Sequence, residues 1–341
     1  MGFKVVNLFP TPGADLGDAL LEPFNATLVK KMCRTEEEII AQAHDADAVI
    51  GPVSVLPFNR HVLEALPKCR IIAGMAIGYD KTDVEAATEL GMAVTNVPDY
   101  CLDEVSGLAI TFMLALGHRF LTIDRAVRER HIIFTLDKKA LDEVAYPMFR
   151  MRDQTLGIVG LGKIGTVTAL KARGLGMRVM AYDPYVLSPV MESRGVKSVD
   201  LDTLLKESDF ISIHTPLTSE TKNMFGYEQF KKMKRTAYFI NTARGGCVVQ
   251  PGLVQALKEG LIAGAGIDVM VDEPIAPENP LLTMNNVILT GHSAWYSVTS
   301  EADLVRRPMT QVVQALRGEW PAYAVNPEAK AKWMARWVKT G

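Results

Sequence analysis

The stretch T-L-G-I-V-G-L-G-K-I-G-T-V-T-A-L-K-A-R-G-L-G-M-R-V-M-A-Y-D, residues 155–183, decides the fold. It opens with a short apolar run at 156–159, and a glycine-rich turn follows. A helical stretch at 166–175 leads to a second apolar run at 178–182, which ends in Asp183. Strand, turn, helix and strand in this order predict a β-α-β unit of a parallel sheet.

The glycines of that turn, Gly160, Gly162 and Gly165, have G-x-G-x-x-G spacing. The first permits a tight turn, the second lets a pyrophosphate approach the backbone, and the third lets the helix pack close to the strand. The helix N-terminus offers free N–H groups and a positive dipole end to phosphates. Asp183 can accept hydrogen bonds from ribose hydroxyls and would repel a 2′-phosphate. The stretch therefore predicts an NAD site, and the alternative is a glycine-rich turn that binds nothing.

Composition is that of an ordinary globular enzyme. A length of 341 residues predicts two domains, and 48% of the residues are apolar and 22% charged. Lys and Arg number 37 against 39 Asp and Glu, a net charge of −2, which argues against nucleic-acid and membrane-surface partners. No apolar run approaches the roughly 18 residues that a membrane span requires.

Cysteine and histidine usage points to a cytoplasmic protein without a metal. Cys33, Cys69, Cys101 and Cys247 are scattered, with no C-x-x-C motif, and are expected to be reduced thiols. The six histidines show no metal-ligand spacing. The start M-G-F-K-V-V is typical of a strand rather than a signal peptide.

Strands and helices alternate along the rest of the chain, which predicts parallel sheets. Thr35 is the expected N-cap of one helix, because acidic residues follow it in the first turn. Pro308 predicts a kink or break inside another helix. Strands are predicted over 4–9, 46–51, 70–74, 92–96, 208–214, 236–241, 263–269 and 286–291, and helices over 35–44, 59–66, 83–90, 103–120, 251–258, 300–317 and 329–338.

Unusual polar residues gather where four of these segments end. Ligands of open α/β sheets bind beyond the carboxyl ends of the strands, so the four loops are candidates for the site. Three of them supply an arginine, a glutamate and a histidine, namely Arg244, Glu273 and His292. The loops are H-T-P-L-T (214–218), N-T-A-R-G-G (241–246), D-V-M-V-D-E-P (268–274) and G-H-S-A-W-Y (291–296).

At these motifs the chain resembles the D-isomer-specific 2-hydroxyacid dehydrogenases. Residues 78–101 resemble the first signature of the family, G-L-G-K-I-G the second, N-T-A-R-G-G the third, and the D-E-P and H-S-A-W region the fourth. H-S-A-W-Y and V-N-P-E (325–328) are similar to the C-terminal-binding-protein branch. The resemblance is weakest over 1–45, 121–150 and beyond 328.

The family implies an NAD-dependent oxidoreductase that transfers a hydride between NAD(H) and a small 2-oxo or D-2-hydroxy acid. By resemblance, Arg244 binds the carboxylate and carbonyl of the substrate with its planar fork. His292 resembles the proton donor in reduction and the acceptor in oxidation. Glu273 resembles its hydrogen-bonded partner, which would raise the pKa of His292.

The family also implies two doubly wound parallel-sheet domains with a cleft between them. The NAD-binding Rossmann domain is expected at 102–296. The substrate domain is expected to be flavodoxin-like and discontinuous, over 1–101 and 297–341, because the final helix would return to the N-terminal unit. A homodimer formed through the nucleotide domain is expected by resemblance.

Further contacts are carried over position by position. Val105 resembles the residue under the nicotinamide, Asp268 the acceptor for its carboxamide, and Thr215 and Pro216 the loop along the adenosine. Substrate contacts are expected from the backbone of Ala76, Ile77 and Gly78 and from Trp295. The full set of expected cofactor contacts is Gly160, Gly162, Lys163, Ile164, Gly165, Asp183, His214, Thr215, Pro216, Thr221, Thr242, Ala243, Asp268 and Val105.

Other interpretations of these residues stay open. Arg244 could form a structural ion pair, Glu273 could be a turn acid, and Trp295 could be plain core packing. A different class of function is an NAD(H)-sensing scaffold that recruits protein partners, as animal C-terminal-binding proteins do. A third possibility is oxidation of formate or phosphite on the same fold, against which the Trp295 loop and the apolar segment 75–77 argue. Gly291 stands where the family usually has proline, which predicts a looser His292 loop.

Overall fold

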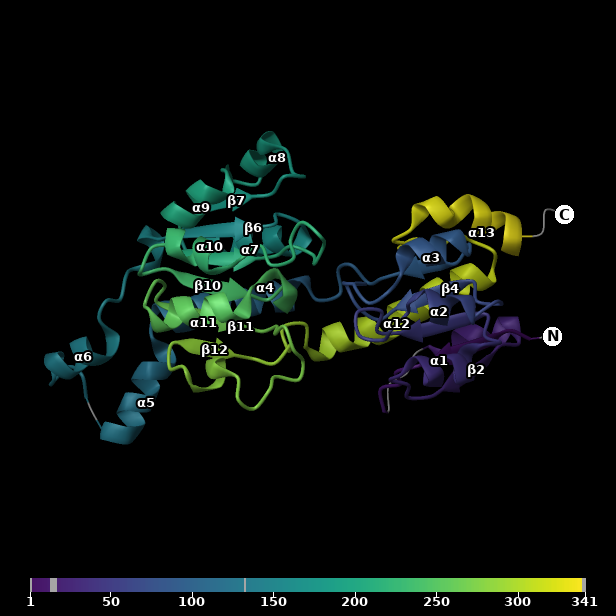
Figure 1. Ribbon diagram of the computed structural model, residues 1–341, viewed down its shortest axis with the longest axis horizontal. Helices are drawn as coiled ribbons and strands as arrows, with labels where there is room; N and C mark the ends of the chain where they lie inside the picture. Colours follow the sequence, from purple (N-terminus) through teal and green to yellow (C-terminus); the bar gives the residue numbers. More distant parts are fainter. Residues whose placement is uncertain (1, 13–16, 132, 339–341) are drawn as a thin grey trace. The chain divides into compact units, whose positions relative to one another are not determined.

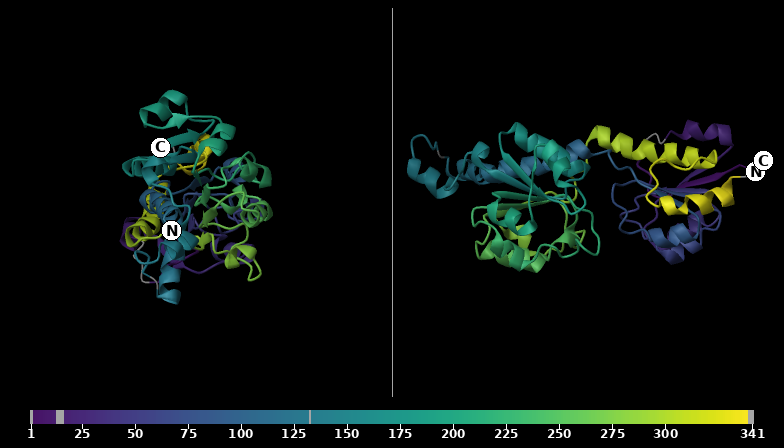
Figure 2. Two further views of the ribbon diagram at one scale, coloured as in Figure 1. Left: turned by 90° about the vertical axis from the view of Figure 1, so that its left-hand side faces the viewer. Right: turned by 90° about the horizontal axis from the view of Figure 1, so that it is seen from above.

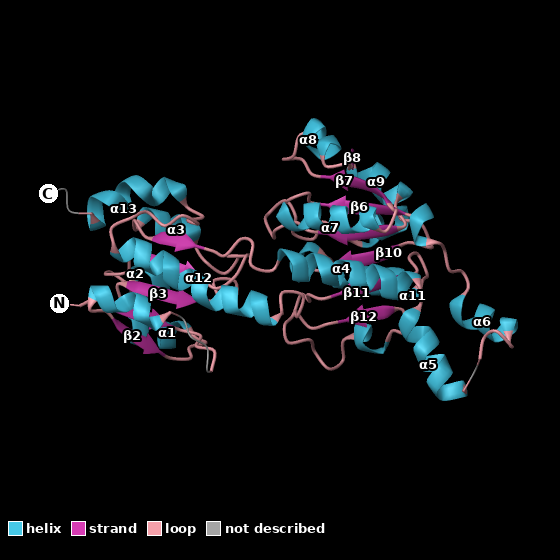
Figure 3. Cartoon of the chain, turned by 180° about the vertical axis from the view of Figure 1, so that it is seen from behind, coloured by secondary structure: helices cyan, strands magenta, loops and turns pink. Residues whose placement is uncertain are grey.

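The computed structural model describes residues 2–12, 17–131 and 133–338. The chain divides into two compact units, Met1–Tyr100 with Ser297–Gly341 and Cys101–Tyr296 (Figure 1). Each unit is built on one parallel sheet, and helices cover both faces of each sheet (Figures 2 and 3). The predicted α/β class with two doubly wound sheets is confirmed.

The first unit contains a five-stranded sheet in the order β2-β1-β3-β4-β5. This is the strand order of flavodoxin-like folds. The central strands are short apolar runs that are buried along their whole length, as parallel strands with two covered faces must be. The strands are β1 (Lys4–Asn7), β2 (Thr27–Lys30), β3 (Ala48–Gly51), β4 (Ile71–Gly74) and β5 (Ala93–Thr95).

The first three helices of this unit begin at side-chain caps. Thr35 accepts a hydrogen bond from the backbone N–H of Glu38, and the Glu38 carboxylate accepts one from the N–H of Thr35, so the predicted cap is confirmed as a capping box. Asn59 and Asp83 cap the next two helices. The helices are α1 (Glu36–Ala43), α2 (Arg60–Glu64), α3 (Val84–Glu89), α12 (Val298–Leu316) and α13 (Lys330–Trp337), with 3-10 turns at Asp18–Phe24 and Pro327–Ala329.

The C-terminal segment packs onto this sheet. On α13, Trp333 is fully buried and its indole N–H donates to Arg70 O at 2.8 Å. Of the kink or break predicted at Pro308, the break does not occur, since α12 continues through it. Pro308 is buried and its neighbours Met309 and Val305 belong to the core, so packing along the helix offsets the lost backbone hydrogen bond.

The second unit contains a seven-stranded sheet in the order β12-β11-β10-β9-β6-β7-β8. Side chains alternate between its two faces, as Phe239 of β10 packs on one face and Ile240 on the other. The order reverses between β6 and β9, which creates the switch point where ligands bind in such sheets. The strands are β6 (Thr155–Val159), β7 (Arg178–Tyr182), β8 (Lys197–Ser198), β9 (Phe210–Ile213), β10 (Tyr238–Asn241), β11 (Gly264–Ile267) and β12 (Val287–Leu289).

Helix α4 lies at the centre of one face of this sheet. A Cβ on Gly266 of β11 would lie 2.5 Å from Phe112 Cγ, so the glycine allows α4 to pack closely on the strand. The helices of the unit are α4 (Leu102–Gly117), α5 (Phe120–Arg130), α6 (Lys138–Ala145), α7 (Lys163–Gly174), α8 (Ser188–Ser193), α9 (Leu201–Glu207), α10 (Tyr227–Lys232) and α11 (Gln250–Lys258), with 3-10 turns at Met151–Asp153, Gly245–Cys247 and Pro280–Thr283.

Several elements differ from the sequence prediction. The helix expected over 103–120 ends at Gly117, because Arg119 adopts a φ of +48° and a new helix, α5, starts after it. The helix of the glycine motif begins at Lys163 rather than at Thr166. Helices α5 and α6 extend away from the rest of their unit (Figure 1). None of the described helices could cross a membrane alone; α4 and α5 meet the length and composition test only as a pair, bent by 52°.

Candidate active site

The glycine turn lies between β6 and α7. Gly160 has a φ of +93° and donates to Tyr182 O at 3.0 Å, which ties the turn to the end of β7. A Cβ on Gly165 would lie 2.2 Å from Gly160 O, so α7 packs tightly on the turn. A Cβ on Gly162 would meet nothing within 4 Å. The turn therefore leaves open space above Gly162, where α7 begins.

Polar groups around that space fit a dinucleotide. The N–H groups at the first turn of α7, at Lys163 and Ile164, have no carbonyl within the helix to bind. Asp183 stands beside the turn, where its carboxylate accepts hydrogen bonds from the N–H of Leu161 at 2.8 Å and of Tyr185 at 2.9 Å. Orphan N–H groups at a helix N-terminus are suited to a phosphate, so the residues present fit NAD.

The loop after β9 carries the next expected cofactor contacts. Burial lowers the pKa of His214 to about 4, so this imidazole is neutral, and its Nε2 lies 2.9 Å from Ser212 Oγ. Thr215 packs against Gly160: a Cβ on Gly160 would lie 2.9 Å from Thr215 Cγ2. The hydroxyl of Thr221 donates to Pro216 O at 2.6 Å and closes the loop on itself. The loop is thus held beside the glycine turn.

The turn after β10 presents Arg244. Asn241 Oδ1 accepts from the N–H of Ala243 at 3.0 Å, and its amide donates to Arg244 O at 2.9 Å. Thr242 Oγ1 is buried and has no hydrogen-bond partner within the described ranges. A Cβ on Gly245 would lie 1.8 Å from Met270 O, so only glycine lets this turn approach the loop after β11.

Asp268, the first residue after β11, anchors the neighbouring loop. It is 1% exposed, and its Oδ1 accepts from Thr290 Oγ1 at 2.6 Å, from Ser293 N at 2.9 Å and from Ala294 N at 3.2 Å. Its backbone carbonyl also accepts from the N–H of His292. The buried carboxylate therefore fixes the loop that carries the histidine.

His292 and Glu273 form a hydrogen-bonded pair. His292 Nδ1 lies 2.7 Å from Glu273 Oε2, and Nδ1–H donates because an ionised carboxylate can only accept. The other carboxylate oxygen accepts from Met270 N at 3.0 Å. Both side chains are partly open, with 42% and 40% of their surfaces exposed. Among the described residues no hydrogen bond reaches Nε2, so this nitrogen is left to bind another molecule.

The hydrogen bond between His292 and Glu273 shifts the pKa values of the two side chains in opposite directions. The hydrogen bond with Glu273 raises the pKa of His292 and outweighs the burial that lowers it. Burial raises the pKa of Glu273. The hydrogen bonds from His292 and from Met270 N–H lower it by more than burial raises it, so the pKa lies below the usual range. The charge of Arg244 lowers both pKa values, so the arginine lies within electrostatic reach of the pair.

The loop of His292 has an uncommon backbone. Gly291 has a φ of +59° and His292 one of +60°, a conformation that L-residues rarely adopt. Proline at 291 could not take this φ. Trp295 is half-buried, and its ring meets that of Tyr296 edge-on at 5.5 Å between centroids. Val105 lies in the first turn of α4 and is 6% exposed.

The remaining expected contacts belong to the first unit. Ala76, Ile77 and Gly78 follow β4 in a loop that residues after β5 hold in place. The N–H of Val97 donates to Ala76 O at 2.9 Å, and the amide of Asn96 donates to Ile77 O at 2.8 Å. Their carbonyls are thus engaged.

Three positioning groups, Asn241, Thr290 and Asn96, were assigned no role in the sequence analysis, although the first was placed in a candidate loop. Each is a polar residue that directly follows a strand or forms its end. Asparagine at a strand end is a known turn signal, so the two asparagines could have been found from sequence. No grouping of three or more His, Cys, Asp or Glu side chains suited to a metal ion occurs in the part of the chain that the structure describes.

Comparison with known proteins identifies the family to which this chain belongs. Residues 110–294 match the family model described as D-isomer specific 2-hydroxyacid dehydrogenase, NAD binding domain. A glyoxylate reductase of Korarchaeum cryptofilum is 40% identical over 294 residues, which cover 86% of this chain and 87% of that protein. A hydroxypyruvate reductase of Blautia hydrogenotrophica is 36% identical over 290 residues, which cover 85% and 88%.

The likeness extends to solved structures. The crystal structure of a glyoxylate reductase from Paecilomyes thermophila matches with a TM-score of 0.82 at 26% identity and covers 96% of this chain and 99% of that chain. The similarity therefore spans both units and not only the nucleotide-binding one.

Proposed function

Because the chain belongs to the D-isomer specific 2-hydroxyacid dehydrogenase family, we propose that it reduces short 2-oxo acids, chiefly glyoxylate and hydroxypyruvate, with NADH. The reaction class is that of an NAD-dependent oxidoreductase acting between 2-oxo and 2-hydroxy acids. The substrates are the finer part of the proposal, and the names of the similar reductases support them.

One observation carries the assignment of roles: the hydrogen bond of 2.7 Å between His292 Nδ1 and Glu273 Oε2 beside Arg244. A carboxylate on Nδ1 fixes the ring and favours the imidazolium, so Nε2–H is the proton to be donated. NADH, when bound, supplies the hydride. His292 gives its proton to the carbonyl oxygen, so that the 2-oxo acid gains a hydride and a proton and leaves as the 2-hydroxy acid.

Arg244 is proposed to hold the substrate. Its guanidinium can form two parallel hydrogen bonds with the carboxylate and carbonyl oxygens, which orients the carbonyl and stabilises charge that develops on its oxygen. The Asn241 turn and the close approach at Gly245 keep the arginine next to the loop of Glu273. Backbone N–H groups of the Ala76–Gly78 loop, in the first unit, are proposed to bind a substrate carboxylate.

Trp295 and the apolar residues Met75 and Ile77 are proposed to limit the side chain of the substrate. They favour a carbon substituent over formate or phosphite, which have none. H-S-A-W-Y and V-N-P-E support a place for this chain near the C-terminal-binding-protein branch. An NAD(H)-sensing scaffold is the less favoured alternative, because the similar proteins are named as reductases.

We also propose a cytoplasmic homodimer. The four cysteines are buried, and within the described residues none takes part in a disulfide, in keeping with a reducing compartment. Exposed apolar side chains concentrate on and around α5 and α6, including Leu136 at 85%, Tyr146 at 76% and Phe120 at 62% exposure. Such a patch marks an interface. Light scattering of Leu136→Glu should report a loss of dimer, whereas Leu20→Glu, on the first unit, should leave it intact.

The proposed function is tested by measuring the loss of NADH absorbance in the presence of each of a panel of 2-oxo acids. We expect turnover with glyoxylate and hydroxypyruvate and little with larger aromatic 2-oxo acids. Arg244→Ala should lower kcat/KM by about 10³-fold and leave NADH binding intact. Tight NADH binding without turnover of any acid in the panel would instead support the scaffold.

A further inference from the structure

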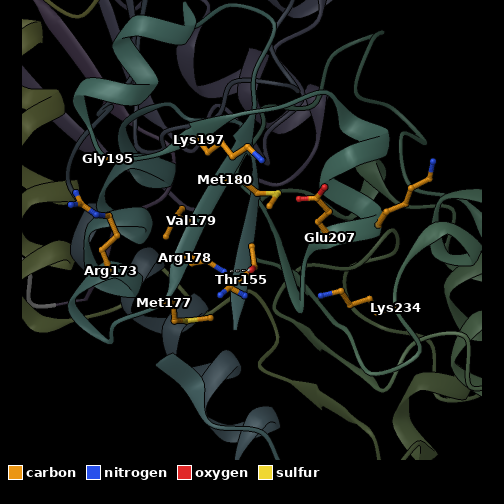
Figure 4. Close-up of a pocket in the computed structure, with 11 residues that line it drawn as sticks. Thr155, Arg173, Met177, Arg178, Val179, Met180, Gly195, Lys197, Glu207 and Lys234 are labelled. Atoms are coloured by element: carbon orange, nitrogen blue, oxygen red, sulfur yellow. Dashed lines mark hydrogen bonds between the residues drawn. The ribbon is translucent and has the colours of Figure 1, made fainter. Parts of the chain in front are cut away.

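A hollow of about 650 Å³ opens at the other end of the seven-stranded sheet from the glycine turn. Thr155 and Arg178, the first residues of β6 and β7, lie at its centre (Figure 4). The glycine turn follows the opposite end of β6, at Gly160. The hollow is therefore distinct from the cofactor loops and the acid–base pair, which all follow carboxyl ends of strands.

Positive charge dominates the lining of this hollow. Five of its lining side chains are cationic and one is a carboxylate. They come from separate parts of the fold, so the cluster is no sequence run. The cations are Arg173 on α7, Arg178 on β7, Lys197 on β8, Lys206 on α9 and Lys234 before β10, and the carboxylate is Glu207 on α9.

Some of these cations are held in place by neutral or acidic partners. The guanidinium of Arg178 donates to Thr155 Oγ1 at 3.1 Å and to Asp153 O at 2.9 Å. Lys234 forms an ion pair with Asp209 at 2.7 Å. Hydrogen bonds to neutral groups leave the charge of Arg178 uncompensated, whereas that of Lys234 is balanced.

The two remaining lysines have no such partner. Across the described residues, neither Lys197 nor Lys206 makes an ion pair or side-chain hydrogen bond. The ammonium of Lys197 and the carboxylate of Glu207 point toward one another across the hollow (Figure 4), but no ion pair joins them. Unpaired like charges that share a hollow attract an anion from solution.

A glycine, Gly195, makes room for the side chain of Arg173 at the edge of the hollow. Its guanidinium donates to Arg194 O at 3.0 Å. A Cβ on Gly195 would lie 2.3 Å from Arg173 Cζ, so the lack of a side chain at 195 makes room for the guanidinium. Arg173 is exposed, but its guanidinium lies against the backbone at Gly195 and Arg194, which holds this cation at the edge of the hollow.

The hollow also has an apolar part. Met177, Val179 and Met180 line it and are only 5%, 7% and 6% exposed. Its volume lies within the roughly 300–1,000 Å³ of small-molecule sites. An apolar wall next to cations suits an anion with a carbon framework better than an inorganic ion.

We propose that this hollow binds a small organic anion that carries at least two negative charges. The charged groups meet Lys197, Lys206 and Arg173, and the carbon part lies against Met177 and Met180. Phosphate esters and polycarboxylates share this chemistry, because both accept charge-assisted hydrogen bonds from ammonium and guanidinium groups. The proposal does not depend on the identity of the 2-oxo acid.

The test is calorimetric titration of the full chain saturated with NADH, which blocks the cofactor site. ATP is the phosphate probe and citrate the polycarboxylate probe. The variant Lys197→Ala with Lys206→Ala removes the two unpaired charges, and Lys139→Ala with Lys258→Ala is the matched control, since both of these lysines are exposed and lie outside the lining. Thermal unfolding of each variant confirms that it is folded.

We expect one saturable site per chain for at least one probe, weakened at least about ten-fold by the first double variant and unchanged by the control. Binding of ATP alone assigns phosphate esters, and binding of citrate alone assigns polycarboxylates. Three outcomes overturn the proposal: no saturable binding of either probe, equal weakening by both double variants, or release of NADH by the probe.

Discussion

The two ends of the seven-stranded sheet are built in different ways. At the carboxyl end, the two polar side chains that anchor the loops, Asp268 and Asn241, are each 1% exposed and hold several neighbours. At the amino end, cations around the hollow are largely exposed, and Lys197 and Lys206 have no partner among the residues described. Chemistry needs groups that are oriented before the substrate arrives, whereas an anion can be attracted by charge alone.

The carboxyl end also holds the unfavourable backbone. His292 has a φ of +60°, which costs on the order of 1–3 kcal/mol for a residue with a side chain. The three N–H and O–H groups that reach Asp268 Oδ1 offset this cost. The difference between the two ends is thus one of rigidity, and it can be tested by making equivalent changes at each.

The largest effect is expected at the proposed proton donor. His292→Asn keeps a polar side chain but has no titrating nitrogen, so kcat for reduction should fall by about 10³-fold. NADH binding should be retained, because the glycine turn lies on another loop. Steady-state kinetics and NADH fluorescence measure the two quantities, and a loss of less than about ten-fold would contradict the proposed role.

The next effect compares one chemical change at both ends. Asp268→Asn turns an amide N–H₂ toward backbone donors that need an acceptor, so the free energy of unfolding should fall by about 2–4 kcal/mol. Glu207→Gln, at the exposed amino end, should change it by less than about 0.5 kcal/mol. Urea unfolding measures both variants. Equal losses would show that the two ends do not differ in rigidity.

A smaller effect is expected along a single helix, α7. Gly165→Ala places a Cβ 2.2 Å from Gly160 O and should destabilise the fold by about 1–3 kcal/mol. Gly174→Ala, at the other end of the helix, meets nothing within 4 Å and should stabilise by up to about 1 kcal/mol. Chemical denaturation resolves the sign. Stabilisation by both alanines would refute the close approach at the glycine turn.

The smallest effect is a displacement of the pH profile. The hydrogen bond with Glu273 raises the pKa of His292 above its ordinary value of 6.5, so the imidazolium persists to higher pH. Reduction needs this protonated form, so its rate falls as pH rises through the raised pKa, while oxidation gains. Glu273→Gln removes the carboxylate and should move the falling limb of kcat to lower pH. A limb that keeps its position would mean that another group titrates.

Much of the fold followed from local sequence. The β-α-β unit at 155–183 and the cap at Thr35 depend on residues close along the chain, and so they could be predicted before any tertiary contact was known. The short strands β2 and β8 and the helices α8, α9 and α10 were missed. These elements are two to seven residues long and have only a weak apolar pattern. Such short elements gain their stability from packing on neighbouring elements.

The sequence by itself determined the fold class, the glycine turn and which residue types stand at strand ends. Only the tertiary structure decided which strand ends are neighbours: β10, β11 and β12 are adjacent, so the loops of Arg244, Glu273 and His292 meet although each is far from the next in sequence. The buried anchor at Asp268 and the cationic hollow arise in the same way. Periodicity and turn chemistry act over a few residues, whereas these sites are assembled by sheet order and close packing, which no local pattern encodes.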